Sequence, residues 1–258
     1  AALDMFREGH YDIIVSDIMM PIMDGYEFAK EAGHNVTELK PALCGINLKG
    51  DFYKNLQGLT LKNVRLSVSC NGKRIKEFFG EALFTHFGIS GPIVLSASSI
   101  INRLDLDKVR LSLDFKPALN EEQLENRILR DFEAAKNKSV FNVLKELLPV
   151  ALIPEVLRRS GVSEDKKVNS VTKSERLRIL TTVKNFDMLT ASLRGFSEAI
   201  VTAGGVDVKQ INPKTMESKI IKGLRFCGEV LDVDAFTGGF NLQIAFATGY
   251  AAGNSIKE

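Results

Sequence analysis

The sequence of 258 residues contains no tryptophan and only three histidines and three cysteines. Cys44, Cys70 and Cys227 are widely spaced and form no CxxC pair, which excludes a disulfide framework. With so few histidines this spacing also predicts no metal site, and the three thiols are expected to be buried. No apolar run approaches the roughly 18 residues that span a bilayer, and no basic stretch followed by an apolar core opens the chain. We therefore expect a cytoplasmic protein without a membrane partner.

An excess of charge of one sign is also lacking. Thirty-four Lys and Arg residues are balanced by 32 Asp and Glu residues, so the net charge is only +2. This balance argues against nucleic acid as a partner. With 45% apolar and 26% charged residues the composition is that of a folded protein, and its length predicts about two domains; the oligomeric state is left open. Because the sequence begins at Ala1 in helix-like text, we interpret it as a fragment of a longer protein.

The middle of the chain changes its hydrophobic period twice. Val64, Leu66 and Val68 alternate with polar residues and lead to Asn71-Gly72, the strongest short signal for a hairpin. Residues 109–116 alternate in the same way, which predicts a small antiparallel barrel or sandwich. Residues 120–184 then follow a period of 3.6, and strands are expected again at 189–193 and 200–202.

Each predicted helix of the 120–184 region begins or ends with its own signal. Asn120 and Gln123 predict a capping box before an apolar stripe, and Thr172 and Glu175 predict a second one. Other boundary signals are Ser139 before a helix at 140–148, Pro154 in the first turn of another, and Gly161 at its end. These patterns predict a helical subdomain.

The sharpest candidate site lies in residues 223–253. A predicted strand at 224–226 leads to Gly228-Glu229, and Gly238-Gly239 precede a helix of small residues expected to pack closely on a sheet. Free N–H groups at such a helix start can bind an anion or a polarised carbonyl, and Glu229 can accept hydrogen bonds from sugar hydroxyls. On the residues alone, a tight turn with a closely packed helix is the favoured interpretation.

The same residues resemble a known family. GE, LDVD, TGGFNLQ and a TG-x3-AG helix are similar to the last FAD-contacting segment of the BaiN-like, or aminoacetone-oxidase-type, flavoproteins. Residues 33–43, 80–92 and 201–219 (GHNVTELKPAL, GEALFTHFGISGP and VTAGGVDVKQINPKTMESK) resemble that family's segments in its order, so the resemblance covers residues 24–258. It implies FAD as cofactor, NAD(P)H as electron donor, and hydride transfer to a small-molecule substrate.

The resemblance also assigns roles to particular residues. The cofactor-binding residues that it implies are Gly228, Glu229, Asp234, Gly238, Gly239, Phe240 and Asn241. Ala235 stands where the family has a glycine, which puts the contacts of that loop in doubt. His86 is the candidate catalytic acid or base, although a histidine that holds a Gly-Pro turn is the favoured interpretation because no carboxylate partner can be assigned. The catalytic residue therefore stays open.

The first segment differs from that family. FAD proteins of this type place a GxGxxG between a strand and a helix to bind the pyrophosphate, and no such motif is present. Residues 11–28 instead resemble a response-regulator receiver domain, with an apolar strand at 13–15, Asp17 as the phosphoacceptor and a helix near Gly25 to Glu31. The receiver's metal-binding acidic pair and its lysine are lacking, so Asp17 with Asp12 and Asp24 is interpreted as a remnant.

The predicted fold class is therefore α/β with a β-barrel and a helical insert, in which an incomplete Rossmann-like FAD domain is interrupted by the barrel. The predicted division is 1–31 receiver-like, 32–117 and 185–212 barrel, 118–184 helical, and 213–258 FAD-binding. The leading hypothesis is a flavin-dependent oxidoreductase impaired by loss of its GxGxxG half. The alternatives are a response-regulator-like signalling protein that uses Asp17, or an inactive chimera.

Overall fold

The computed structural model describes residues 13, 15–17 and 23–256. These residues form two compact units, each described by itself. Unit 1 contains the described residues of Ala1–Leu39 and Thr202–Glu258, and unit 2 is Lys40–Val201.

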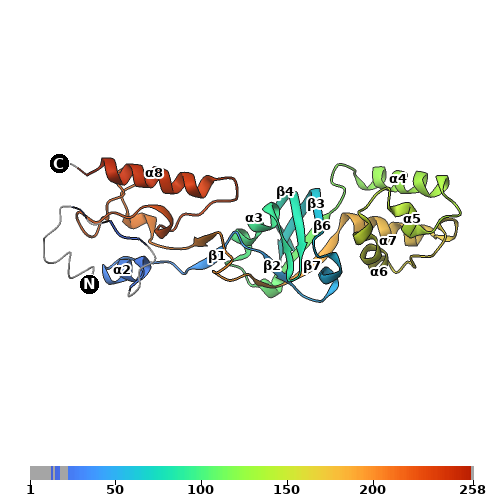
Figure 1. The fold of residues 1–258 in the computed structure, drawn as a ribbon, viewed down its shortest axis with the longest axis horizontal. Helices are drawn as coiled ribbons and strands as arrows, with labels where there is room; N and C mark the ends of the chain where they lie inside the picture. The colour runs from blue at the N-terminus through green and yellow to red at the C-terminus, as the bar shows by residue number, and fades with distance from the viewer. Residues whose placement is uncertain (1–12, 14, 18–22, 257–258) are drawn as a thin grey trace. The chain divides into compact units, whose positions relative to one another are not determined.

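Unit 2 is built on a closed antiparallel barrel whose strands follow the order β2-β5-β4-β3-β6-β7 (Figure 1). The strands are β2 Ile46–Leu48, β3 Thr60–Cys70, β4 Lys73–Thr85, β5 Gly88–Ser90, β6 Val109–Asp114 and β7 Phe186–Leu193. Closure pairs every strand on both sides and so leaves no free edge. The short strand β1 Lys40–Ala42 precedes the barrel. The predicted barrel is therefore confirmed.

The predicted hairpin is formed by β3 and β4. Asn71 and Gly72 have φ values of 52° and 76°, as a two-residue turn with left-handed central residues requires. The alternation of β3 has the predicted phase, since Val64, Leu66 and Val68 are all buried.

Helix α3 (Pro92–Ile101) was not predicted. It begins after Gly91, whose φ is 99° and where a Cβ would lie 3.0 Å from the carbonyl oxygen of Glu81, so only glycine fits there without strain. Ile93, Val94 and Ala97 are buried, and a helix this apolar shows no clear amphipathic period from which it could be predicted. Two 3-10 turns, Phe52–Leu56 and Leu106–Lys108, complete the barrel's connections.

The helical insert agrees closely with its predicted boundaries. Its helices are α4 Glu121–Ala134, α5 Val140–Leu144, α6 Ile153–Ser160 and α7 Lys173–Lys184, with 3-10 turns at Val150–Leu152 and Val168–Ser170. Asn120 and Thr172 both form capping boxes, Ser139 caps α5, and Gly161 ends α6 with a φ of 64°. Helix α5 ends earlier than predicted, at Leu144 rather than Leu148.

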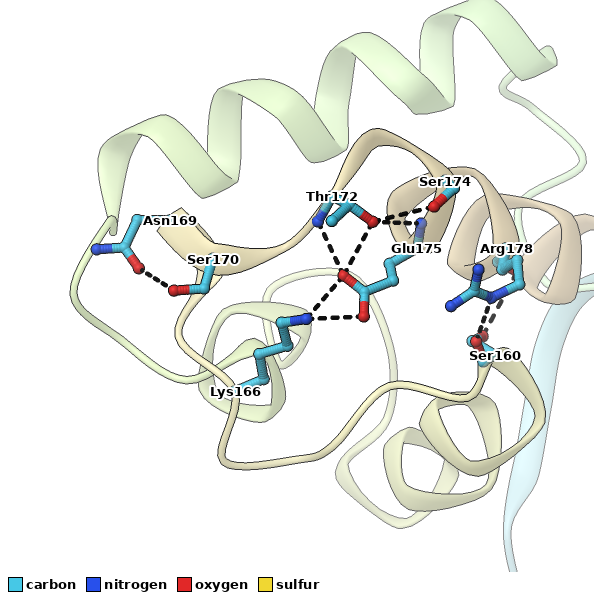
Figure 2. A network of polar contacts seen from close by, with 8 residues as sticks. All are labelled: Ser160, Lys166, Asn169, Ser170, Thr172, Ser174, Glu175 and Arg178. Carbon is cyan, nitrogen blue, oxygen red and sulfur yellow. Dashed lines mark hydrogen bonds and ion pairs between the residues drawn. The ribbon is translucent and has the colours of Figure 1, made fainter.

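Figure 2 shows the second capping box and what surrounds it. Glu175 accepts a hydrogen bond from the N–H of Thr172 at 2.8 Å and pairs with the Lys166 ammonium at 2.7 Å. These contacts, with that of Lys166 first, lower the pKa of Glu175 to about 2. The box therefore joins the start of α7 to the loop that follows α6.

One apolar cluster runs through the barrel and the insert. Phe84 and Phe186 lie at its centre with ring centroids 6.5 Å apart, and Leu124 and Ile128 of α4 and Val156 of α6 belong to the same cluster. Glu155 of α6 is nearly buried, and it is matched by Arg158 and Arg159, whose nitrogens each lie 2.7 Å from its carboxylate. Unit 2 thus has a single continuous core.

Unit 1 consists of one long helix, several short elements and loops. Its elements are α2 Gly25–Glu31, β8 Val201–Ala203 (which begins at the last residue of unit 2), the 3-10 turns Val208–Gln210 and Gly228–Val230, and α8 Phe240–Asn254. Its buried cluster is small and includes Tyr26, Val206, Ile211, Phe226 and Leu231. The helix predicted near Gly25 is confirmed, and Asp24 caps it by accepting from the N–H of Glu27 at 2.8 Å.

Several predictions for this unit were wrong. The strand expected at 224–226 is not formed, because Arg225 makes only an isolated bridge with Glu217. Cys227 is exposed rather than buried, whereas Cys44 is buried as expected and Cys70 is intermediate. Of the residues of α8 only Ala252 is buried, so the close packing expected of its small residues is absent within the described part of unit 1. The Rossmann-like sheet stays a prediction.

The receiver-like strand is also not seen where residues are described. Ile13 and Val15 lie outside any strand and have exposed fractions of 58% and 92%, so the apolar strand expected at 13–15 is not formed at these two positions. Ile14 and Asp12 lie outside the described residues.

Candidate functional site

The candidate site is built where two distant segments of unit 1 run side by side. The N–H of Val206 donates to the carbonyl of Val230 at 2.8 Å, and the N–H of Asp232 donates to the carbonyl of Val206 at 2.9 Å. Gly205 permits this approach, because a Cβ there would collide with the carbonyl oxygen of Val230. Gly205 therefore allows residues 202–206 to lie against residues 229–232.

This pairing fixes Glu229. One of its carboxylate oxygens accepts from the N–H of Thr202 at 2.7 Å, and its main-chain carbonyl accepts from the hydroxyl of Tyr26 at 3.2 Å. Burial, reinforced by the nearby charge of Glu229, raises the pKa of Tyr26 from 10 to about 12, so the phenol remains a hydrogen-bond donor even in alkaline solution near pH 10. The Glu229 side chain is exposed, and its second oxygen can accept further hydrogen bonds.

A second contact joins this turn to α8. The N–H of Gly228 donates to the Thr248 hydroxyl at 2.9 Å, and that hydroxyl donates back to the carbonyl of Ile244 at 2.7 Å. Gly228 has a φ of 75°, which its missing side chain allows. The turn that carries Glu229 is thereby held against the middle of the helix.

The first N–H groups of α8 have no partner within the helix itself. Gly239 caps the helix with a φ of 85° and no side-chain hydrogen bond, and the first helical bond runs from Gln243 to its carbonyl at 3.0 Å. The N–H groups of Phe240, Asn241 and Leu242 precede that bond and point out of the helix end, where the helix dipole favours negative charge. Gly238 is equally constrained, since its φ is 122° and a Cβ would lie 3.1 Å from the Phe240 ring.

Asn241 lies in the first turn of α8, and its side chain turns back onto the preceding loop. Its side-chain amide donates to the carbonyl of Ala235 at 2.8 Å and accepts from the Ala235 N–H at 2.9 Å, which closes the loop before the helix. What Asn241 offers a ligand is therefore its backbone N–H. Ala235 is not among the residues with positive φ, so its methyl group adds no backbone strain, and its effect on the contacts of this loop with a flavin stays a prediction.

The other predicted residues lie as follows. Asp234 is half-buried in the same loop, and Phe240 is 59% exposed at the helix start. His86 belongs to unit 2, where it occupies the turn between β4 and β5 and its ring meets that of Phe87 edge-on at 5.1 Å. Among the described residues none forms a hydrogen bond or ion pair with His86, which leaves no partner for acid or base catalysis.

No group of three or more His, Cys, Asp or Glu side chains among the described residues can hold a metal ion. Asp17 is described, but Asp12 is not, and Asp24 is used as a helix cap. Sequence analysis missed Thr202, Tyr26 and Thr248, because no local pattern links positions so far apart to Glu229.

The fold defined by these observations is a closed antiparallel barrel with a helical insert, accompanied by a loop-rich unit that carries a glycine-bounded helix start. The chain belongs to the HI0933-like family, because the family model described as "HI0933-like protein barrel and H2TH domain" matches residues 40–201. The match coincides with unit 2. It confirms the predicted resemblance at the level of a family with a barrel and a helical insert, whereas the comparisons give no support to a receiver-like segment.

Curated relatives cover both units. The ribosomal RNA dihydrouridine synthase of Haemophilus influenzae is 31% identical over 236 residues, 91% of this chain and 56% of the relative. The ribosomal RNA dihydrouridine synthase of Escherichia coli is 30% identical over 90% of this chain and 56% of its own length. The 3-dehydro-bile acid delta(4,6)-reductase of Clostridium scindens is 28% identical over 91% of this chain and 58% of its own length. The chain thus spans little more than half the length of these relatives. Among the described residues no helix is long and apolar enough to cross a bilayer.

Proposed function

We propose that this chain contributes the flavin-contacting part of a flavin-dependent oxidoreductase, with FAD as cofactor and NAD(P)H as electron donor. The observation that carries the proposal is the start of α8, where N–H groups without a partner in the helix follow Gly238 and Gly239 and where the loop is closed by Asn241. The reductase activity in the name of one relative supports the same reaction class.

The donor set fits the polar part of a flavin. Backbone N–H groups at a helix start match the carbonyl edge of the ring, which gains negative charge on reduction, and an exposed carboxylate matches a polyhydroxyl chain. Glu229 would hold that chain, and the N–H groups of Phe240 and Asn241 would orient the ring. When bound, the flavin supplies the hydride chemistry, while the protein binds, orients and shields it. The sequence holds no GxGxxG for the pyrophosphate, so we expect the purified chain to carry less than one FAD per molecule.

Titration with riboflavin, FAD and ADP, followed by flavin fluorescence, tests this proposal. Riboflavin and FAD are expected to bind with Kd values within about threefold of each other, because the contacts lie at the ring and its hydroxyl chain. For the same reason ADP should not compete. Glu229→Gln should weaken riboflavin about tenfold through loss of charge-assisted bonds.

Glu31→Gln is the matched control, since Glu31 is also exposed in unit 1 but lies on α2. Equal loss in both variants, or displacement of riboflavin by ADP, would contradict the proposed site. Stoichiometric FAD in the purified chain would instead contradict only the expectation of a weakened cofactor site.

Two substrate classes are compatible with this chemistry. The resemblance stated above implies a small molecule, and one relative is named for a bile acid derivative. Two relatives are named for ribosomal RNA.

A further inference from the structure

We propose that helix α8 binds the α8 of a second copy of this chain, antiparallel to it, and so forms a weak symmetric dimer; this inference goes beyond the proposed function. The feature that carries it is an apolar side of α8. Leu242, Phe246 and Tyr250 follow one another at intervals of four residues and therefore lie on one side of the helix, where they are 64%, 70% and 76% exposed. The opposite side carries Thr248 and the buried Ala252, which contact the rest of unit 1.

The composition of α8 does not suit a surface that stays in water. Its 15 residues include no Asp, Glu, Lys or Arg. The exposed side of a helix in a globular protein normally carries charged and polar residues. Three large side chains exposed to this degree instead present roughly 400 Å² of apolar surface, the size of patch that marks an interaction site. The absence of charge also means that two copies of α8 would not repel each other.

Two glycines lie on the same side as the large residues. Gly249 and Gly253 are one turn apart and follow Phe246 by three and seven residues. Apart from the helix's own backbone, no atom of the described residues lies within 4 Å of the place where a Cβ would stand at either glycine. Glycine inside a helix is destabilising relative to alanine, so contacts within unit 1 do not account for these two. A second helix that approaches closely would account for them, because glycine allows another backbone to come near.

The large and small residues are placed so that two copies fit each other. In an antiparallel pair with its two-fold axis between Ala247 and Thr248, Leu242 lies level with the partner's Gly253 and Phe246 lies level with the partner's Gly249. A single axis matches both pairs, because each pair is centred on the same point of the sequence. A parallel pair would instead place the large residues level with each other. The helix surface is therefore self-complementary in one orientation, as a symmetric dimer requires.

The area available predicts weak association. The large side chains of two copies would bury about 800 Å² in total, below the roughly 1,200 Å² of stable complexes. We therefore expect a reversible dimer that dissociates in the micromolar range. The other candidate occupant is a segment from the part of the curated relatives that this chain does not span. The match between large and small residues favours a second copy, and the experiment decides between the two.

Sedimentation velocity of the 258-residue chain tests the proposal. At about 2 µM the chain should be mainly monomeric, and at about 200 µM mainly dimeric. Phe246→Glu should weaken association at least about 30-fold, because it places a charge in the middle of the contact in both copies. Gly249→Leu should weaken association about tenfold, because the added side chain keeps the two helices apart.

Ala247→Glu is the matched control. Ala247 is exposed and follows Phe246 directly, but it lies on a different side of α8, so this variant should change affinity by less than about twofold. Helix content measured by circular dichroism should be equal in all variants, which separates loss of the dimer from loss of α8.

Two outcomes would overturn the proposal. Gly249→Leu enlarges the apolar surface, so stronger association of this variant would show general adhesion in place of a specific fit. A chain that is still monomeric at about 200 µM would assign this side of α8 to the part of the relatives that the chain does not span.

Discussion

The two units of this protein are stabilised in different ways. Unit 2 closes its barrel so that every strand is paired, and one apolar cluster continues into the helical insert. Unit 1 has a small cluster, and its segments are joined by individual polar contacts such as Thr202 with Glu229 and His34 with Ser218. On α8, Phe246 and Tyr250 are 70% and 76% exposed. The large apolar core thus lies in unit 2, whereas the candidate site lies in unit 1. Ligand-binding segments are commonly found in the less stable part of a protein.

The variant with the largest expected effect on stability removes an aromatic ring from the core of unit 2. Phe186 is fully buried and contacts the rings of Phe52, Phe84 and Phe115. Phe186→Ala should lower the free energy of unfolding of unit 2 by about 3 to 5 kcal/mol through lost burial and a cavity. Urea denaturation measures this, and amide exchange should show α8 unchanged.

Phe196→Ala is the control, with an expected change within about 0.5 kcal/mol because Phe196 is exposed. If α8 lost protection together with the barrel in Phe186→Ala, the two units would be one cooperative structure and the comparison would fail.

Acidification should affect the two units in different pH ranges. Burial lowers the pKa of His34 below 6.5, so its neutral form is favoured in the folded state and unit 1 loses stability as pH falls below 6.5. The pKa of Glu175 is lowered from 4.5 to about 2, so its ionised form is favoured and its contribution to unit 2 is lost only as pH falls from 4.5 towards 2. NMR spectra recorded between pH 7.5 and 2.5 should show unit 1 changing first.

Two variants test which residue causes each of these pH-dependent changes. His34→Asn should abolish the change that begins below pH 6.5, and Glu175→Gln should remove part of the slope between pH 4.5 and 2. Simultaneous loss of both units' signals, at one pH and in both variants, would show that neither group governs its unit.

The sequence predicted the elements of unit 2 better than those of unit 1. The turn at Asn71-Gly72 and the caps at Asn120 and Thr172 depend on residues within three positions of one another, and all were predicted. The strand expected at 224–226 depended on a neighbour that local pattern cannot supply, and the segment forms only one bridge. Local rules suffice where propensity and packing agree, as in unit 2.

The candidate site shows the limit most clearly. Gly238, Gly239 and Glu229 were singled out because glycines and a carboxylate beside a helix start form a recognisable pattern. Thr202 lies 27 residues before the carboxylate that it holds, and Tyr26 is 203 residues away from the carbonyl that it contacts. The sequence places Asn241 at the helix start but does not show that its side chain turns back to Ala235. Contacts across the chain therefore decided which atoms of the site are available.

The smallest expected effect concerns a single cap in unit 2. Asn120 accepts from the N–H of Gln123 at 2.8 Å, and Gln123 accepts from the N–H of Asn120 at 3.0 Å. Asn120→Ala leaves an N–H at the start of α4 without its acceptor and should lower the free energy of unfolding by about 1 kcal/mol. Asn126→Ala is the matched control: Asn126 is exposed within the same helix, where alanine is the better helix former, so stability should stay equal or rise slightly. Urea denaturation of both variants measures the difference. An equal loss in both variants would mean that the cap contributes nothing specific to the stability of the insert. Local helix-capping signals would then not help to stabilise unit 2.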